Sequence, residues 1–517
     1  MCAPLRIADL QPATGPAPGA LTTVYDTFFR ASQIGVNGSN VAYAYDADGL
    51  LTGAGSMTLA RDAGNGMVTG TTLGQIATTQ SYDSFGQVSG FTAKQGATVL
   101  FDEQYQRDNS GNLTRKTVTL DGQTSVYGYA YDAAGRLADV TKDGIAAGHF
   151  EYDANGNRTL AYGTIAGYDD QDRLTSFGAA QYAYTANGEL QKITGATTAA
   201  SYEYDVSGNL KHVDLPNGST LDYLADGRNR RVGKKVNGTL VQGFLYQDQL
   251  KPAAELNGQG NVVSRFVYAG KANVPDYMVK GGATYRIIGD QLGSVRLVIN
   301  SATGQIAQRI DYDEWGNVLS DSNPGFQPFG FAGGLYDRDT GLVRFGARDY
   351  DPHVGRWTVK DPIGFGGGDT GLYGYVGGNP ISYTDPNGLT PVGIAVGIGV
   401  RVIGGRAAAA IGAGARSLLG PTVGGIAACV LAGVCTLSDG NDAIEPKPNR
   451  EQKPEGCPVG TKPIDKDKRL DRKKIHGIKD QIGAGARDWV GISPDGRIWT
   501  NEGGQAANNG PFEDYLP

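Results

Sequence analysis

Tyr131-Asp132-Ala133-Ala134-Gly135 is the stretch that decides the fold, because its pattern of Tyr-Asp, two further residues and Gly returns along the chain. Five other full copies share this pattern and lie at 45–49, 82–86, 152–156, 204–208 and 312–316. Degenerate copies begin at Tyr168 and Tyr184, so that successive units from residue 131 to residue 204 are separated by 21, 16, 16 and 20 residues. A period near 20 residues indicates a repeat protein.

Each unit predicts a β-hairpin. An alternating strand ends in Tyr, Asp and Gly supply the turn, and a second alternating strand follows, as at 209–213. One hairpin cannot bury its own apolar face, whereas stacked hairpins can. We therefore expect a mainly β protein with a long, curled antiparallel sheet, in which Tyr rings pack along the strands while Asp and Asn cap the turns.

The composition excludes several other classes of protein. A formal net charge of −7 over 517 residues disfavours a chain that coats nucleic acid non-specifically. The chain has 4 cysteines, with neither the spacing of zinc ligands nor the density of a disulfide scaffold, and we expect no metal and no cofactor. Residues 1–20 lack the basic and apolar regions of a secretory signal, so we expect delivery by a non-Sec route.

The repeats resemble the YD repeats of the Rhs and teneurin-like family, whose sheet spirals into a hollow shell. The resemblance is carried further by the motifs at 285–296, 345–352, 355–357, 361–364, 379–380 and 385–389. The last motif, Asp385-Pro386-Asn387-Gly388-Leu389, looks like the end of the Rhs-associated core. The resemblance implies a β shell at 41–310 and an Rhs-associated core at 311–389, after an unassigned segment at 1–40.

The composition changes abruptly after Leu389. Residues 390–438 are rich in Gly, Ala and small aliphatic residues, and 417–438 contain no charge. This uncharged run is long enough for a membrane span, and a buried glycine-rich hairpin is the alternative. Five prolines in 439–464 predict a linker, which leaves a small α+β domain at 465–517.

The motif at the end of the core, through its resemblance to related shells, predicts a cleavage site. In related shells an intramolecular aspartyl protease cuts just after the Asp-Pro-x-Gly-Leu motif, and the resemblance places this cut between Leu389 and Thr390. The reaction needs two carboxylates that share one proton, so that one activates water while the other donates to the scissile carbonyl.

Asp349 and Asp361 are the sequence candidates for this pair. Arg348 would offset their negative charge as a supporting residue, and Asp351 is the substitute if one assignment fails. The alternative is that these aspartates only cap turns, because Asp-Pro and Asp-x-x-Gly are ordinary turn sequences.

The sequence of the terminal domain predicts a basic helix at about 467–482, with an apolar stripe of Ile475, Ile478 and Ile482. On its polar side His476 lies among cations, including Arg472 and Lys479. A His in this setting can act as an acid or base on a phosphodiester while the cations stabilise the developing charge. The alternatives are a solvated basic face and a His without a role.

A hairpin is expected at 488–500, with a turn at 494–496. Arg497 is a further candidate on its second strand, with Ser493 and Thr500 nearby, while Trp489 and Trp499 are expected in its core. A helix followed by a small sheet is similar to the metal-independent ribonuclease toxins of the barnase, colicin and RelE-like group.

The leading functional hypothesis is an Rhs polymorphic toxin used in competition between bacteria. The shell carries residues 390–517, self-cleavage frees them, and the terminal domain attacks RNA in the target cytoplasm. This hypothesis implies a cognate immunity protein with an acidic surface and a type VI or other secretion component. The alternatives are a membrane-active effector that uses 391–438, and a YD-repeat surface protein that binds carbohydrate and has no enzymatic tail.

Overall fold

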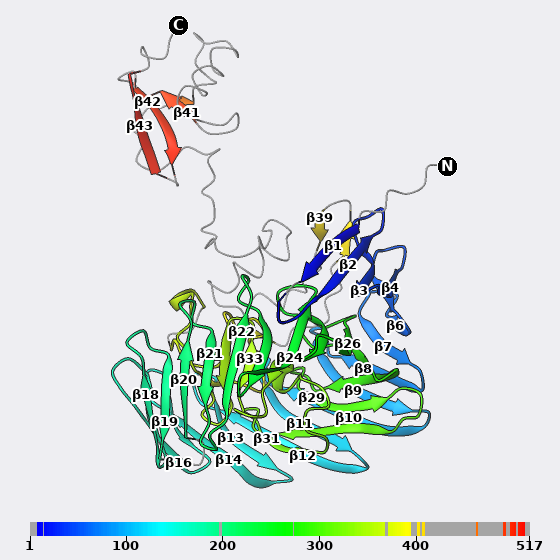
Figure 1. The fold of residues 1–517 in the computed structure, drawn as a ribbon, viewed down its shortest axis with the longest axis horizontal. Helices are drawn as coiled ribbons and strands as arrows, with labels where there is room; N and C mark the ends of the chain where they lie inside the picture. Colours follow the sequence, from blue (N-terminus) through cyan, green and yellow to red (C-terminus); the bar gives the residue numbers. More distant parts are fainter. Residues whose placement is uncertain are drawn as a thin grey trace. The chain divides into compact units, whose positions relative to one another are not determined.

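The computed structural model describes residues 8–13, 15–195, 199–271, 273–367, 371–393, 401–403, 406–408, 462–463, 490–492, 497–502 and 505–511 (Figure 1). The chain divides into two compact units, residues 1–436 and 437–517. Each unit is described by itself.

The first unit is built on one sheet of 31 strands, which we call the wall. Every wall strand pairs antiparallel with the next strand along the chain, as the pairs β1–β2, β15–β16 and β30–β31 illustrate. The predicted mainly β fold, with a long antiparallel sheet, is confirmed. The wall strands are β1 (Ala8–Ala13), β2 (Gly19–Tyr25), β3 (Ala31–Val36), β4 (Ser39–Tyr45), β5 (Leu51–Ala54), β6 (Met57–Arg61), β7 (Val68–Leu73), β8 (Ile76–Tyr82), β9 (Val88–Gln95), β10 (Thr98–Arg107), β11 (Leu113–Leu120), β12 (Gln123–Tyr131), β13 (Leu137–Lys142), β14 (Ile145–Tyr152), β15 (Arg158–Ala161), β16 (Thr164–Tyr168), β17 (Leu174–Phe177), β18 (Ala180–Tyr184), β19 (Leu190–Thr194), β20 (Ala200–Tyr204), β21 (Leu210–Asp214), β22 (Thr220–Ala225), β23 (Arg231–Val236), β24 (Thr239–Tyr246), β25 (Pro252–Asn257), β26 (Val262–Val267), β27 (Tyr277–Lys280), β28 (Ala283–Gly289), β29 (Val295–Asn300), β30 (Ile306–Tyr312) and β31 (Val318–Asp321).

The Asp of each repeat closes its turn, as the sequence predicts. In the unit at 131–136, Asp132 Oδ1 accepts hydrogen bonds from the backbone N–H groups of Ala134 and Arg136 at 2.9 and 3.0 Å. Gly135 takes the left-handed conformation, with φ of 81°, and its N–H donates to the Asp132 carbonyl. The Arg136 guanidinium then pairs with the same carboxylate at 2.6 Å.

In several repeats the Tyr hydroxyl fastens one hairpin to the preceding one. The Tyr152 hydroxyl donates to the Leu137 carbonyl at 2.9 Å, and the Tyr131 hydroxyl donates to the Leu113 carbonyl at 2.7 Å. The Arg136 guanidinium also lies 4.6 Å from the centre of the Tyr152 ring, within cation–π range. The predicted roles of Tyr and Asp in stacking and turn capping are therefore confirmed.

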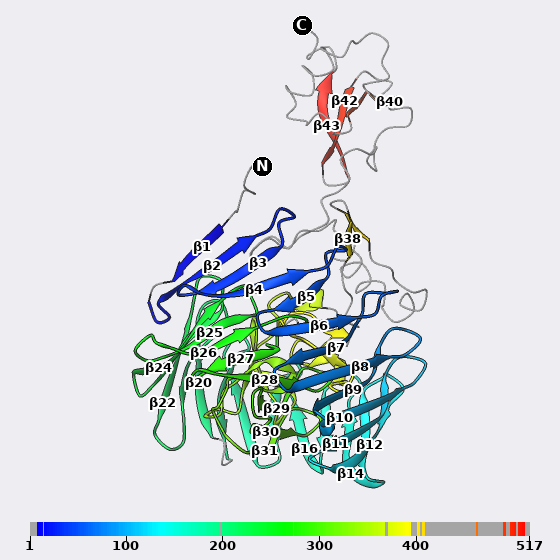
Figure 2. The same cartoon turned by 90° about the vertical axis from the view of Figure 1, so that its right-hand side faces the viewer.

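The wall curls until its late strands meet its first ones. Figure 2 shows β1–β4 beside β24–β27 in the view that displays both ends of the wall. The Tyr277 hydroxyl donates to the Ala54 carbonyl at 3.1 Å, and Arg265 Nη2 donates to the Ile34 carbonyl at 2.7 Å. A shared apolar cluster joins residues of β2 and β3 to residues of β24 and β25.

The wall extends beyond the predicted range of 41–310 at both ends. Strands β1–β3 occupy part of the segment left unassigned by the sequence, and β30 runs past residue 310 to Tyr312. The turn after β2 is of the same kind as the others, since Asp26 Oδ1 accepts from the N–H groups of Phe28 and Arg30. Phe29 occupies the left-handed position with φ of 59°, and a missing Gly conceals this repeat in the sequence.

A short segment after the wall, which we call the core segment (residues 329–393), carries the candidate site. An aromatic cluster of Phe331, Phe345, Tyr350, Trp357 and Tyr375 fills its interior, with the Tyr350 and Tyr375 ring centres 4.2 Å apart. Its strands β32–β35 form a separate four-stranded sheet, and β36 pairs with β37. Its elements are the 3₁₀ turn η1 (Phe331–Gly333), β32 (Leu335–Tyr336), β33 (Val343–Phe345), β34 (Arg348–Asp351), β35 (Arg356–Trp357), the 3₁₀ turns η2 (Gly364–Gly367) and η3 (Val376–Gly378), β36 (Tyr383–Thr384) and β37 (Val392–Gly393).

The remaining described strands are short. β38 (Arg401–Ile403) and β39 (Arg406–Ala408) form a two-stranded pair in the first unit. The second unit contains β40 (Lys462–Pro463), β41 (Val490–Ile492), β42 (Arg497–Glu502) and β43 (Gln505–Pro511). The antiparallel pairing of β41 with β42 confirms the predicted hairpin.

Among the described residues, no helix is both long and apolar enough to cross a bilayer. The predicted span at 417–438 and the helix at 467–482 lie outside the described residues. Of the linker predicted at 439–464, the structure describes only Lys462–Pro463, which form β40 and pair with β41.

Candidate active site

The predicted scissile bond lies in the turn between β36 and β37. These strands pair antiparallel, with Thr384 opposite Val392, so that residues 385–391 form the connection. The Leu389 and Thr390 N–H groups both point at Asp385 Oδ1, at 3.0 and 3.1 Å. The Leu389–Thr390 peptide is therefore held from its nitrogen side by a carboxylate four residues earlier in the chain. We call residues 385–391 the scissile turn.

Two glycines allow the scissile turn to lie directly on the turn between β33 and β34. A Cβ at Gly388 would lie 2.3 Å from the Phe345 carbonyl oxygen, and a Cβ at Gly346 would lie 2.3 Å from the Asn387 carbonyl oxygen. Both glycines also have positive φ, of 68° and 42°. The Ala347 N–H donates to the Asn387 carbonyl at 2.9 Å. The backbone of one turn thus fixes the position of the other.

Arg348, the expected supporting cation, lies between Asp361, Asp385 and the Gly388 carbonyl. Its side chain is 2% exposed, and its Nε donates to the Gly388 carbonyl at 2.6 Å. Its Nη2 lies 2.9 Å from Asp361 Oδ2 and 3.2 Å from Asp385 Oδ2. Its guanidinium carbon also lies 4.1 Å from the centre of the Trp357 ring. A single buried guanidinium therefore brings two carboxylates and the scissile turn together.

Asp361 faces the carbonyl side of the predicted scissile bond. Its Oδ1 accepts from the Ile363 N–H at 3.0 Å, and its Oδ2 is directed toward Gly367 and Arg348. The point at which a Cβ of Gly367 would lie is 2.8 Å from Asp361 Oδ2 and 2.8 Å from the Leu389 carbonyl oxygen. The carboxylate and the carbonyl oxygen therefore both border the space that a side chain at residue 367 would occupy.

Asp385 is the second carboxylate of the site, and the sequence reasoning did not select it. Its side chain is 1% exposed, and burial raises the pKa of this carboxyl, although Arg348 and the backbone N–H groups of the turn act in the opposite direction. A buried carboxyl with a raised pKa retains a proton more readily than an exposed one. Its motif was recognised in the sequence, where Asp-Pro-x-Gly was interpreted as the end of the core. Its position four residues before the bond was the available signal.

Asp349 makes its contacts elsewhere. Its carboxylate accepts from Arg231 Nη2 at 2.9 and 3.1 Å and from Arg344 Nη1 at 3.0 Å. Adjacent residues of a strand point to opposite faces, and Arg348 takes the face toward the scissile turn. The substitute candidate, Asp351, caps a turn instead, since its Oδ1 accepts from the His353 N–H at 3.0 Å. The structure thus brings Arg348 and Asp361 to the bond and pairs Asp349 with two arginines.

Of the candidate residues in the terminal domain, the structure describes only some. Arg497 is the first residue of β42. His476, Arg472 and Lys479 lie outside the described residues. A search of the described residues for three or more His, Cys, Asp or Glu side chains grouped as a metal site found none.

Comparison with known proteins identifies the wall. A family model described as the teneurin YD-shell matches residues 7–366, which include every wall strand and the start of the core segment. Teneurin-3 of Danio rerio is 30% identical over 327 residues, which are 59% of this chain and 12% of that protein. The tRNA3(Ser)-specific nuclease WapA of Bacillus spizizenii is 26% identical over 313 residues, which are 59% of this chain and 12% of that protein.

A solved structure has the same fold. The Tc holotoxin pore of Photorhabdus luminescens superposes with a TM-score of 0.53 at 18% sequence identity, over 74% of this chain and 22% of that chain. The chain spans about an eighth of the length of the curated relatives described above.

Proposed function

The chain belongs to the teneurin YD-shell family, and we propose that it is a toxin-type shell protein that cuts its own chain between Leu389 and Thr390. The carrying observation is the convergence of Arg348, Asp361 and Asp385 on this one peptide bond. The cut would separate residues 390–517 from the wall.

The proposed chemistry is hydrolysis by two carboxylates with unequal environments. Asp361, paired with Arg348, takes a proton from a water that attacks the Leu389 carbonyl carbon. Asp385 lies beside the amide nitrogen and donates a proton to it as the C–N bond breaks. The products are a carboxylate at Leu389 and an amine at Thr390. The positive charge of Arg348 offsets the negative charge that develops around the carbonyl.

Mass spectrometry of the purified full chain tests this proposal. We expect fragments of 389 and 128 residues, with Leu389 as the new C-terminus. Asp361→Asn and Asp385→Asn should each leave the chain intact, because each removes one of the two proton carriers. An intact wild-type chain, or a cut at another bond, would contradict the proposal.

For the segment released by this cut, we propose a metal-independent ribonuclease that acts in the cytoplasm of a competing bacterium. The support is the resemblance of the terminal domain to small ribonuclease toxins and the similarity of the shell to WapA, whose name describes a tRNA nuclease. His476 is the proposed acid or base, with Arg472, Lys479 and Arg497 as phosphate-binding cations. A cognate immunity protein and a secretion component are the partners that this function requires.

A further inference from the structure

Strand β34 connects the candidate site to the wall through two neighbouring side chains. Arg348 points to the scissile turn, where it contacts Gly388 and both candidate carboxylates. Asp349, the next residue, points to the opposite face and meets Arg231, the first residue of wall strand β23. Any displacement of β34 therefore affects both contacts.

Asp349 and its two arginine partners form a buried cluster of charged side chains, which we call the Asp349 cluster (Asp349, Arg231 and Arg344). The side chains of these residues are 1%, 9% and 4% exposed. Arg344 lies on β33, directly opposite Asp349 in the antiparallel register of β33 and β34. Two cations from different parts of the chain thus share one buried carboxylate.

The Asp349 cluster continues into the turns of the wall. Arg344 Nη2 donates to Asn209 Oδ1 at 2.7 Å and to the Asn229 carbonyl at 3.3 Å. Asn209 belongs to the turn before β21 and Asn229 to the turn before β23. The Asp349 cluster therefore requires that this part of the wall is folded, because its cations and acceptors come from strands and turns that meet only there.

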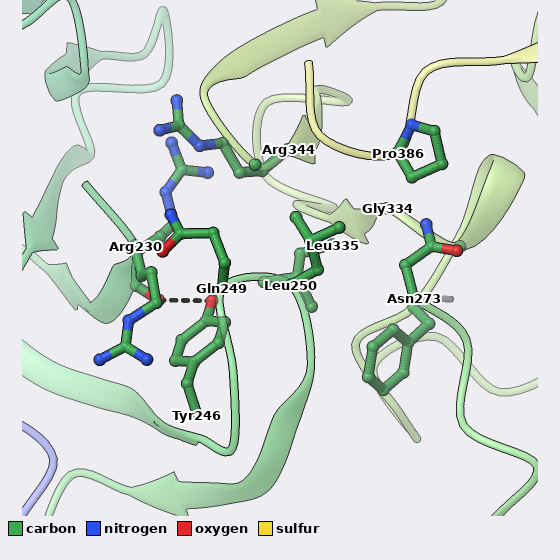
Figure 3. A pocket seen from close by; sticks show the side chains of 13 residues that line it. Arg230, Tyr246, Gln249, Leu250, Asn273, Gly334, Leu335, Arg344 and Pro386 are labelled. Atoms are coloured by element: carbon green, nitrogen blue, oxygen red, sulfur yellow. Dashed lines mark hydrogen bonds between the residues drawn. The ribbon is translucent and has the colours of Figure 1, made fainter. Parts of the chain in front are cut away.

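On its other side, the Asp349 cluster lies close to the scissile turn. A small cavity of about 30 Å³ is lined by Arg231 and Arg344 and also by Pro386 of the scissile turn. Figure 3 shows Arg344 and Pro386 among its lining residues. Gly346, which follows β33, lines the same cavity and lies against Asn387. A shift of β33 and β34 would therefore move the surface on which the scissile bond rests.

We propose that the Asp349 cluster is a positioning device that makes self-cleavage depend on assembly of the wall. This inference rests on the proposed self-cleavage and names a regulation of that site. Without β23, the Asp349 carboxylate and the Arg344 guanidinium lose partners in a buried setting, which disfavours the observed position of β34. With β23 in place, Arg348 is fixed against Gly388 and the two carboxylates. The Leu389–Thr390 bond is then cut only after the wall has folded.

The test compares two buried ion pairs on the same wall strand. Arg231→Gln disrupts the Asp349 cluster, whereas Lys234→Gln disrupts the pair between Lys234 Nζ and Asp337 Oδ1, at 2.7 Å. Lys234 and Asp337 are each 8% exposed and also join β23 to the core segment. Their side-chain hydrogen bonds in the described residues link them to each other, Tyr223 and Asp339, rather than to β34 or the scissile turn. Conversion of the pulse-labelled full chain into its two fragments gives the rate of cleavage.

We expect Arg231→Gln to slow cleavage about 100-fold, as displacement of reacting groups by about 1 Å does in other enzymes. Lys234→Gln should cleave at the wild-type rate. The stability of both variants is compared by urea unfolding in an Asp385→Asn background, so that all chains remain uncut. Equal rates for Arg231→Gln and the wild type, or equal slowing by both variants, would overturn the inference. An uncut wild-type chain would instead overturn the self-cleavage on which the inference rests.

A pH profile separates positioning from catalysis. Asp349→Asn should lower the cleavage rate at every pH and leave the shape of the profile unchanged, because Asp361 and Asp385 still supply the titrating groups. The loss of one limb of the profile in Asp349→Asn would make Asp349 a proton carrier and overturn its positioning role.

Discussion

Asp361 Oδ2 and the Leu389 carbonyl oxygen each lie 2.8 Å from the point at which a side chain at residue 367 would begin. The absence of a side chain at Gly367 therefore leaves open the space between a carboxylate and the carbonyl that it faces. Gly367 has no positive φ, so its backbone accepts alanine. The neighbouring Gly366 has no atom within 4 Å of its own Cβ position.

Gly367→Ala should prevent self-cleavage. The added methyl group would contact both oxygens at a distance that real Cβ atoms essentially never show, and it would occupy the space for the attacking water. Gly366→Ala is the matched control and should cleave at the wild-type rate. The measurement is the fraction of cut chain on a denaturing gel. A cut Gly367→Ala chain would show that the reacting groups approach each other along another path.

Self-cleavage should be faster at acid pH than at alkaline pH. Burial raises the pKa of Asp385, and the proposed reaction uses its protonated form. The rate should therefore be highest below this raised pKa and fall as the pH rises through it. The rate of cleavage of freshly refolded chain, followed across the acid and neutral range, tests this prediction. A rate that rises with pH over that range would contradict the assignment of Asp385 as the acid.

The sequence predicts the wall well because the residues that form each turn and each strand lie within a single repeat. Tyr-Asp-x-x-Gly specifies the turn, the alternating pattern specifies the strands, and stacking is then the only way to bury the apolar faces. Where the Gly is replaced, as at Phe29, the repeat persists in the structure while its sequence signal is lost.

The candidate site is harder to predict because its parts meet only in three dimensions. The motifs point to Arg348 and Asp361, and the structure places Arg348 against Gly388 and Asp361 beside the space that the Leu389 carbonyl borders. Asp349 was selected as the neighbour of Arg348, although alternation along a strand separates adjacent side chains. Asp385 has the sequence of an ordinary turn cap, and its contacts with Arg348 and with the Leu389 and Thr390 N–H groups distinguish it only in the folded chain.

The hydroxyl groups of the buried tyrosines at the ends of wall strands should contribute to stability only where they have a partner. The buried Tyr268 hydroxyl donates to the Pro252 carbonyl at 2.9 Å, so that Tyr268→Phe should lower the free energy of unfolding by about 1 kcal/mol. The Tyr312 hydroxyl is buried and has no hydrogen-bond partner in the described part of the chain. Tyr312→Phe is therefore the matched control and should leave stability unchanged or raise it. Urea unfolding of both variants in an Asp385→Asn background measures the difference, and equal losses would contradict the stacking role of the hydroxyl.

Release of residues 390–517 should be required for damage to RNA. Expression of the full chain from a repressed promoter in a bacterial cytoplasm should produce discrete RNA fragments on a gel. His476→Ala should abolish them, because it removes the proposed acid or base while the cut at Leu389–Thr390 still occurs. Asp385→Asn should also abolish them, because the segment stays attached to the wall. Intact RNA with arrested growth would exclude the ribonuclease and favour a membrane mechanism, which should survive His476→Ala and fail when residues 391–438 are deleted.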